Sequence, residues 1–201
     1  MNEKILNNNP IVVASHNKGK IAEFKFLFLP YNVEVITLSE LGISDVEETG
    51  KTFEENALIK IKNTPSEMNA LSDDSGLCIK ALNEEPGIYS ARFAKKLGGW
   101  ANAMKALYKN VAETDQKCFA ATFHCALALK LKTGEVFTFS GNIEGRITWP
   151  PRGANGFGYD PFFIPKNAKQ TFAEMNHKKK ILADHRFKAF KKMAKSHLIG
   201  N

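Results

Sequence analysis

Cysteine is scarce in this chain of 201 residues, which has only Cys78, Cys118 and Cys125. An odd number of cysteines without a C-x-x-C spacing supports neither a disulfide framework nor a zinc site, so we expect buried thiols. Long apolar runs are missing too, since none approaches the roughly 20 residues that cross a bilayer. The polar start up to Pro10 and the short apolar run Ile11–Ala14 do not fit a signal peptide. We therefore expect a cytoplasmic protein with no membrane partner.

Internal repeats, low-complexity tracts and Gly/Ser-rich linkers are also absent, which predicts a single domain over residues 1–201. Hydrophobic residues make up 43% of the chain and charged residues 24%, and this balance argues against disorder.

Positive charge is present in excess and is unevenly distributed. The net charge is +7, and the segment from Lys166 onward holds 10 basic and two acidic residues. A local positive field of this kind favours an anionic partner, which is a phosphorylated small molecule, a nucleic acid or an acidic surface. A solvated, lysine-rich last helix is the alternative.

The first third of the chain has the pattern of an α/β protein. Ile11–Ala14 and Val33–Thr37 are short apolar runs that predict buried strands. Between them, Lys18–Leu29 has helical spacing and ends at Pro30. A second helix is predicted over Thr52–Lys62, where Thr52 and Glu55 have the spacing of a capping box.

The remainder predicts a hairpin and a closing helix. Cys118–Leu131 and Glu135–Ile143 flank a Gly-containing turn, although the Ala-rich end of the first segment fits a helix as well as a strand. Tyr159–Ile164 is strand-like, and Ile181–His197 has helical spacing. Together the elements indicate an α/β fold with a mixed sheet.

Ser15-His16-Asn17-Lys18-Gly19-Lys20 lies between the first predicted strand and helix. Ligands tend to bind at the carboxyl ends of strands in α/β sheets, and the N–H groups of a helix N-terminus favour an anion there. Lys20 adds a full positive charge. An ordinary turn, in which Ser15 or Asn17 caps the helix, is the alternative.

Two pairs of adjacent carboxylates follow, Glu47-Glu48 and Asp73-Asp74. Adjacent carboxylates repel each other, and a bound Mg²⁺ compensates for that repulsion because it prefers carboxylate oxygens. One carboxylate of such a site can deprotonate or orient an attacking water. For Asp73-Asp74-Ser75-Gly76 taken alone, a solvent-facing turn with Asp as a cap is the favoured interpretation.

The last third holds a glycine- and aromatic-rich loop, Gly153–Pro161, and a basic segment from Lys178 to Arg186. Glycines let the backbone approach a flat ligand, and Phe157 or Tyr159 can stack on a nucleobase. The alternative is a structural turn with buried aromatic rings. Histidine and arginine can read base carbonyl groups, whereas a solvated basic face is the simpler explanation for any single residue.

Taken in order, six motifs resemble the inosine/xanthosine triphosphate pyrophosphatase family from about Ile11 to the last helix. They are Ser-x-Asn-x-x-Lys, Glu-Glu-Thr-Gly, Asp-Asp-Ser-Gly-Leu, Pro86-Gly87-Ile88-Tyr89-Ser90-Ala91-Arg92, Phe157-Gly158-Tyr159-Asp160-Pro161 and His185-Arg186. The resemblance implies an elongated, two-lobed α/β fold around a long mixed sheet with flanking helices, and an active site in the cleft between the lobes. It also implies a homodimer that uses Mg²⁺ to hydrolyse ITP, dITP, XTP or dXTP to the nucleoside monophosphate and pyrophosphate.

The resemblance further implies roles for individual residues. Asp74 would be the general base and a metal ligand, and Glu47, or Glu48 as the alternative, would be the second ligand. Ser75 would touch the substrate. The triphosphate would be held by Ser15, Asn17, Gly19 and Lys20, and the nucleoside by Phe157, Gly158, Tyr159, Asp160, Lys180, His185 and Arg186.

Three positions depart from the family pattern. Asp184 stands where the family commonly has serine, Lys178-Lys179 replaces a usual acidic residue, and Ser15 replaces threonine. These departures bear on substrate preference more than on the reaction. A related pyrophosphatase acting on modified pyrimidine triphosphates and a non-catalytic nucleic-acid-binding protein are the competing hypotheses, although the second gives the paired carboxylates no purpose. We expect no stable nucleic-acid partner.

Overall fold

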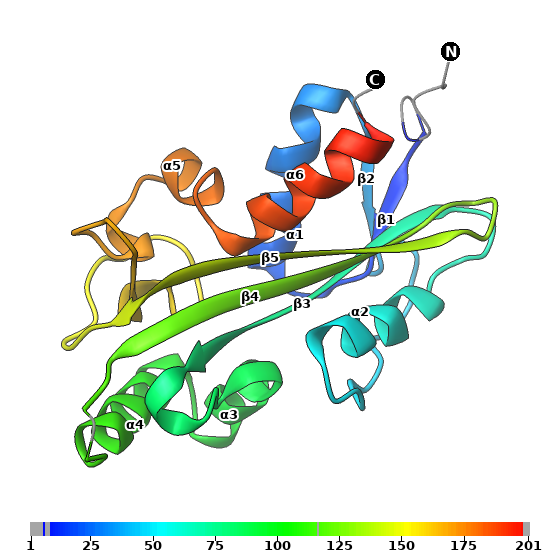
Figure 1. Cartoon of the computed structure of the whole chain (residues 1–201). Coiled ribbons are helices and arrows are strands. Elements are labelled where there is room, and N and C mark those ends of the chain that lie inside the picture. The colour runs from blue at the N-terminus through cyan, green and yellow to red at the C-terminus, as the bar shows by residue number, and fades with distance from the viewer. Residues whose placement is uncertain (1–5, 7–8, 116, 199–201) are drawn as a thin grey trace. The chain divides into compact units, whose positions relative to one another are not determined.

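The computed structural model describes residues 6, 9–115 and 117–198 (Figure 1). Most of the start up to Pro10, which the sequence marks as polar, therefore lies outside the described residues. The described part of the chain forms two compact units. Unit 1 draws on Met1–Asp74, Cys125–Gly141 and Arg186–Asn201, and unit 2 on Ser75–His124 and Asn142–His185. Among the described residues, no helix has both the length and the apolar character needed to span a bilayer.

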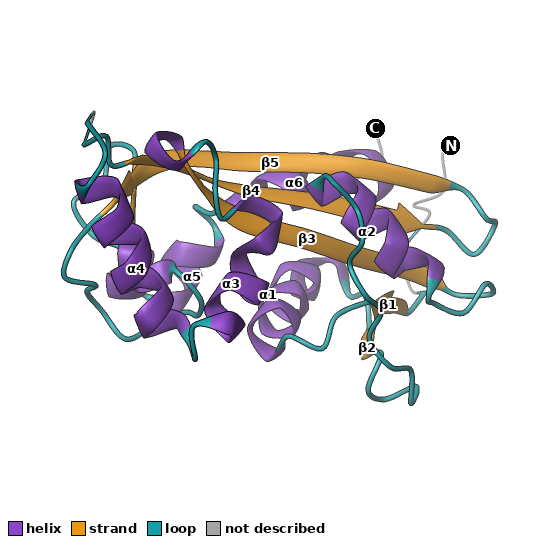
Figure 2. Ribbon diagram, turned by 90° about the horizontal axis from the view of Figure 1, so that it is seen from below, coloured by secondary structure: helices purple, strands orange, loops and turns teal. Residues whose placement is uncertain are grey.

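One mixed sheet has the strand order β2-β1-β3-β4-β5-β6. Its strands are β1 (Ile11–Val13), β2 (Val35–Thr37), β3 (Asn69–Ile79), β4 (Ala120–Lys130), β5 (Val136–Ile147) and β6 (Phe163–Pro165). The first strand is parallel to both of its neighbours, whereas β5 and β6 are antiparallel. The long strands β3, β4 and β5 are consecutive neighbours in the sheet (Figure 2). The predicted α/β class with a mixed sheet and flanking helices is confirmed.

Unit 1 contains α1 (Lys18–Phe28), α2 (Phe53–Lys62) and nearly all of α6 (His185–His197). Thr52 caps α2 by accepting a hydrogen bond from the N–H of Glu55. The Glu55 carboxylate accepts from the N–H of Lys51 at 2.6 Å, one residue before the position that a capping box requires. One core cluster of this unit packs Val12, Ala14, Leu38, Ala57, Ile61, Ala70 and Ala128 together.

Unit 2 contains α3 (Ser90–Lys96), α4 (Trp100–Ala112) and α5 (His177–Ile181). Its core is rich in aromatic rings. The buried members include Leu77, Ile79, Leu107, Phe123, Tyr159, Phe162, Phe163 and Phe172.

Some elements differ from the sequence prediction. The segment from Cys125 to Leu131, which fitted helix or strand, belongs to β4 up to Lys130. Tyr159–Ile164 is not a continuous strand, because a 3₁₀ turn over Asp160–Phe162, with proline in its first turn, precedes β6. The predicted closing helix is divided, since α5 ends at Ile181 and α6 begins at His185.

Candidate functional site

The loop before α1 is shaped by side-chain caps. Asn17 Oδ1 accepts hydrogen bonds from the N–H groups of Gly19 (2.9 Å) and Lys20 (3.2 Å). Ser15 is buried, and its Oγ accepts from the N–H of Asn17 at 3.2 Å. The capping alternative is therefore present in the structure. These caps fix the backbone conformation from which the side chain of Lys20 projects, so the loop is preorganised.

Asp73 is fully buried and stands among cations in unit 1. Its Oδ2 lies 3.0 Å from Lys20 Nζ and 3.0 Å from Arg186 Nη2. Burial alone would raise the pKa of this carboxyl, but the charges of Lys20, Arg186 and Lys60 prevail and hold the pKa far below its usual range. Asp73 is therefore a permanent anion that positions the basic groups around it.

Asp74, the next residue of β3, has the opposite electrostatic behaviour. It is 4% exposed, and Asn56 Nδ2 donates a hydrogen bond to its Oδ2 at 2.9 Å. Burial raises its pKa to about 6; Lys20 opposes this rise and the charge of Glu48 adds to it. A carboxylate with a pKa near neutrality accepts a proton readily, which is the property that a general base requires.

Asn56 joins the two acidic motifs. Its Oδ1 accepts from the N–H of Gly50 at 2.8 Å, while its Nδ2 donates to Asp74. A Cβ atom on Gly50 would lie 2.7 Å from Asn56 Oδ1 and 2.7 Å from Glu55 Cβ, so only glycine fits this approach. The Glu-Glu-Thr-Gly loop is thus tied to the Asp-Asp-Ser-Gly strand by one amide side chain.

Lys60 provides the second connection between these motifs. It is buried, and its Nζ donates to the carbonyl oxygen of Asp73 (2.7 Å) and to Glu48 Oε1 (3.2 Å). Burial lowers the pKa of this ammonium, but Asp73, Glu48 and Asp74 outweigh it and the net shift is upward. Glu48 is half-buried against Lys60, whereas Glu47 is exposed.

Arg186 completes the cluster of unit 1. It is 1% exposed, donates to the carboxylate of Glu23 as well as to Asp73, and lies 5.7 Å over the ring of Phe24. The sequence interpretation assigned this guanidinium to the nucleoside, but here its donors point to protein carboxylates. It belongs to unit 1, whereas its neighbour His185 belongs to unit 2.

A second cluster lies in unit 2 around Lys180, which is 3% exposed. Its Nζ is 3.3 Å from Asp160 Oδ2 and 3.2 Å from Asp184 Oδ2, and it lies 5.0 Å over the ring of Phe157. Asp160 also accepts from the N–H of Phe157 at 2.9 Å. The departure at Asp184 therefore supplies Lys180 with a second carboxylate. Lys180 and Arg186 are not part of a solvated basic face.

The aromatic residues of the glycine-rich loop differ in exposure. Tyr159 is 2% exposed, forms an edge-to-face pair with Trp100 and belongs to the core of unit 2. The buried-aromatic alternative therefore describes Tyr159, and Phe157 is half-buried. His185 is also buried, and its ring stacks on Phe123 with a centroid distance of 4.7 Å.

The Pro86–Arg92 motif supports the strand that follows the acidic pair. Ser90 Oγ accepts from the N–H of Leu77 (3.0 Å) and donates to the carbonyl oxygen of Gly87 (2.8 Å). A Cβ atom on Gly76 would clash with that carbonyl group, so the close approach requires glycine. The motif therefore holds β3 in place directly after Ser75, which is half-buried.

Sequence reasoning missed several residues of these clusters, including Glu23, Asn56, Lys60, Trp100 and Phe172. A signal existed for two of them. Asn56 and Lys60 are one helical turn apart and adjoin the apolar pair Ala57 and Ile61, so they fall on the face of α2 that is buried. A polar residue on a buried face needs a partner, and here the acidic strand supplies it.

The fold and the site define an α/β protein in which a raised-pKa carboxylate, Asp74, is under the influence of Lys20 and Lys60 within unit 1. The chain belongs to the Ham1 family, whose model matches residues 11–196. The family relationship inferred from the ordered motifs is thereby confirmed.

Similar proteins agree over nearly the whole chain. The dITP/XTP pyrophosphatase of Agrobacterium fabrum is 43% identical over 207 residues, which cover 95% of this chain and 97% of the relative. The dITP/XTP pyrophosphatase of Bacillus subtilis is 42% identical over 189 residues, with 92% and 94% covered. The solved structure of a HAM1 protein from Coxiella burnetii matches with a TM-score of 0.84 at 36% identity, and covers 94% of this chain and 98% of that one.

Proposed function

We propose that this chain is a nucleoside triphosphate pyrophosphatase that hydrolyses ITP, dITP, XTP or dXTP to the nucleoside monophosphate and pyrophosphate. The names of its relatives and the chemistry of the two clusters support this proposal. The observation that carries it is Asp74, a buried carboxylate whose pKa is raised to about 6 beside Lys20 and Lys60. We further propose that residues 1–201 act as one domain, as a homodimer, on the cytoplasmic nucleotide pool.

The donor set fits a magnesium ion. Part of the rise in the pKa of Asp74 comes from the like charge of Glu48, and a divalent cation relieves repulsion between carboxylates. Asp74 and Glu47 would hold the ion. Glu48 is the alternative second ligand, and it ranks behind Glu47 because its carboxylate already pairs with Lys60. When bound, Mg²⁺ supplies neutralisation of charge on the phosphate oxygens.

In the reaction, the residues of the chain bind the triphosphate and move one proton. Asp74 accepts a proton from the attacking water, and the hydrogen bond from Asn56 fixes the orientation of its carboxylate. The water oxygen forms a bond to phosphorus as the α–β anhydride bond breaks, and pyrophosphate leaves. Lys20, with Ser15, Asn17 and Gly19 of its loop, would bind the phosphates, and Ser75 would contact the substrate. Asp73 and Arg186 keep Lys20 and the strand in position.

In unit 2, we propose that Phe157 offers its half-buried ring to the base and that Lys180, held by Asp160 and Asp184, fixes that ring and the loop. Gly158 leaves the backbone close to the ring of Trp100 without a side chain of its own. Tyr159 would contribute to the nucleoside site from its place in the core of unit 2. His185 would offer a ring nitrogen to a base carbonyl group.

A product assay tests the proposal. The purified chain is incubated with dITP, XTP, dUTP, ATP and GTP, with and without Mg²⁺, and pyrophosphate, orthophosphate and monophosphate are measured. We expect pyrophosphate from dITP and XTP only when Mg²⁺ is present. Orthophosphate as the product, or equal turnover of all five nucleotides, would contradict the proposal. Preferential turnover of dUTP would support the pyrimidine alternative instead.

A further inference from the structure

Cys78 and His124 lie on the same side of the sheet within unit 2. Side chains alternate along a strand, and Leu77 and Ile79 both enter the core of this unit, so Cys78 between them faces the other side. Ala121 and Phe123 also enter that core, and His124 therefore faces away from it. Because β3 and β4 are neighbours, the two outward side chains come together.

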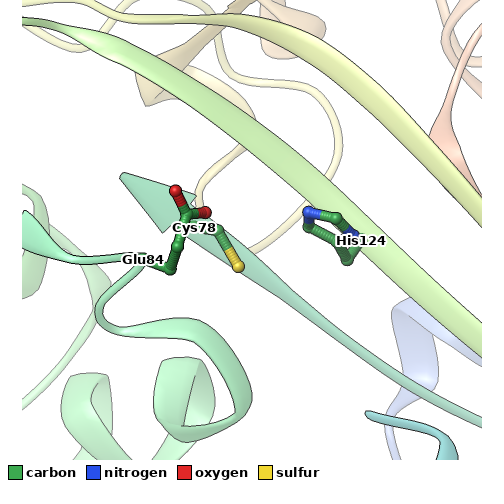
Figure 3. A group of neighbouring side chains, drawn as sticks. All are labelled: Cys78, Glu84 and His124. Carbon is green, nitrogen blue, oxygen red and sulfur yellow. The ribbon is translucent and has the colours of Figure 1, made fainter. Parts of the chain in front are cut away.

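The chain after β3 folds back and brings Glu84 to the same place. The N–H of Glu84 donates to the carbonyl oxygen of Ile79 at 3.1 Å, and Cys78 and Pro86 form an antiparallel bridge. Asn83 and Glu84 both have positive φ, 53° and 67°. This region is uncommon for glutamate, and here it turns an exposed carboxylate toward Cys78. Figure 3 shows the three side chains gathered from the strand, the turn and the neighbouring strand.

We propose that Cys78, Glu84 and His124 form a binding site for a zinc-class transition-metal ion, with water as a further ligand. One ligand atom from each residue lies within 4.8 Å of the other two. In a tetrahedral zinc site, bond lengths of about 2.0–2.3 Å place ligand atoms roughly 3.5 Å apart. The distances between the ligand atoms must therefore shorten by about 1 Å for all three to bind one ion. Rotation of the exposed Glu84 side chain can supply much of this change.

The donor set selects a soft or borderline metal over magnesium. Thiolate and imidazole prefer zinc-class ions, whereas Mg²⁺ prefers oxygen ligands. A cavity of about 450 Å³ beside Cys78 and Glu84 is also lined by Lys80 and Arg146. The positive charges of these two side chains oppose the binding of any cation on charge alone. The affinity for a metal ion therefore depends on the type of ligand atom. The cavity gives an ion and a water ligand access to Cys78.

The protonation states of His124 and Cys78 bear on metal binding in different ways. Burial lowers the pKa of His124, although the charge of Glu84 opposes the shift, and the lower pKa favours the neutral imidazole that binds metals. Burial, together with the charges of Glu84 and Glu85, raises the pKa of the Cys78 thiol to about 12. The thiol must therefore lose its proton to solvent as the metal–sulfur bond forms, and one proton is released for each ion bound.

The site is tested with Co²⁺ as a spectroscopic probe of zinc-class binding. The full chain is kept reduced, stripped of metal with a chelator that is then removed, and titrated with Co²⁺ in excess Mg²⁺. We expect one Co²⁺ per chain, a thiolate-to-cobalt charge-transfer absorption, and loss of that absorption on addition of Zn²⁺. The Cys78→Ser variant should lose the absorption. The His124→Asn variant should weaken binding at least about tenfold, because outer-shell partners alone contribute 10- to 100-fold.

Matched controls change the same residue types elsewhere in unit 2. Cys118→Ser and His177→Asn, at a half-buried and an exposed position, should retain both the absorption and the affinity. Circular dichroism checks that each variant is folded, and Cys78→Ala replaces Cys78→Ser if serine at this buried position prevents folding. The proposal is overturned if the native chain shows no charge-transfer absorption, or if the absorption persists without Cys78 or is unaffected by His124→Asn. Hydrolysis is not the readout, so this result is independent of the proposed function.

Discussion

Lys20 Nζ and Asp73 Oδ2 lie 3.0 Å apart, in an ion pair whose carboxylate is completely buried and whose lysine is 12% exposed. The pair connects the loop before α1 to the acidic strand β3. A buried carboxylate is costly unless cations remain around it, so the pair constrains both segments. The position of Lys20, on which phosphate binding depends in our proposal, is thus fixed before any ligand arrives.

A double-mutant cycle measures this relationship. We predict that Lys20→Met and Asp73→Asn are coupled by about 0.5–3 kcal/mol in the free energy of unfolding, the range for residues in one ion-pair network. Denaturant unfolding of both single variants and the double variant gives the value. Lys18→Met, at an exposed position of the same helix, should show no coupling with Asp73→Asn. Additivity within about 0.5 kcal/mol would refute the constraint.

Substitution of the two adjacent glutamates separates metal binding from support of Lys60. Glu47 is exposed, so Glu47→Gln should leave the melting temperature unchanged but raise the Mg²⁺ concentration for half-maximal activity at least about tenfold. Glu48→Gln should lower the melting temperature, because it removes the carboxylate charge that pairs with buried Lys60. Activity measured across a Mg²⁺ titration, with melting curves, distinguishes the two. If only Glu48→Gln raises the Mg²⁺ requirement, Glu48 is the ligand.

Lys180 should act on substrate affinity through the Phe157 loop. Lys180→Met leaves Asp160 and Asp184 without their shared cation, and we predict a loss of about 10- to 100-fold in kcat/KM for dITP, mostly in KM. Steady-state kinetics provide the measurement. The neighbouring Lys179 is exposed, and Lys179→Met should match the native chain. An unchanged KM for Lys180→Met would remove this residue from the substrate site.

His197 makes the stability of unit 1 depend on pH. Burial lowers its pKa, although a hydrogen bond with the Met193 backbone and the charge of Glu135 oppose the shift. Because the folded pKa lies below the unfolded value of about 6.5, stability is fully present above that pH and declines as pH falls toward the folded pKa. We predict that the melting temperature drops less between about pH 7.5 and pH 5.5 in His197→Gln than in the native chain. Exposed His16→Gln is the control, and an equal drop in both variants would contradict the expected contribution.

Much of the fold follows from local sequence signals. The short parallel strands around α1 could be predicted because Ile11–Val13 is a continuous apolar run and Asn17 is a strong capping residue. The length of β3 could not, since Asp73 and Asp74 interrupt its apolar pattern and look like a turn. They remain in the strand because Lys20, Lys60, Arg186 and Asn56 compensate for their burial. Those partners come from distant parts of the sequence, where no local pattern links them.

The order of the motifs predicts which residues form the candidate site, whereas their grouping into two clusters is visible only in the folded structure. The sequence motifs named Asp74, Lys20, Lys180 and Arg186 but not which carboxylate each cation contacts. Asp184 illustrates the limit. As a departure from the family pattern it suggests a changed substrate preference, and the folded structure shows that it pairs with Lys180, four residues earlier in the chain. The Cys78–Glu84–His124 group is similarly invisible in a search for C-x-x-C spacing, because a strand, a turn and a second strand contribute one residue each.

The central claim is that Asp74 is the general base of a Mg²⁺-dependent pyrophosphatase, and the rate of pyrophosphate release from dITP by Asp74→Asn tests it most directly. Asparagine preserves the shape of the side chain and can still meet Asn56, but it cannot accept the proton of the attacking water. With saturating Mg²⁺ and dITP, and with Asp115→Asn as an exposed control, we predict that kcat falls about 10²- to 10⁴-fold in Asp74→Asn while the variant stays folded. A folded Asp74→Asn variant that retains most of the native kcat would contradict the account.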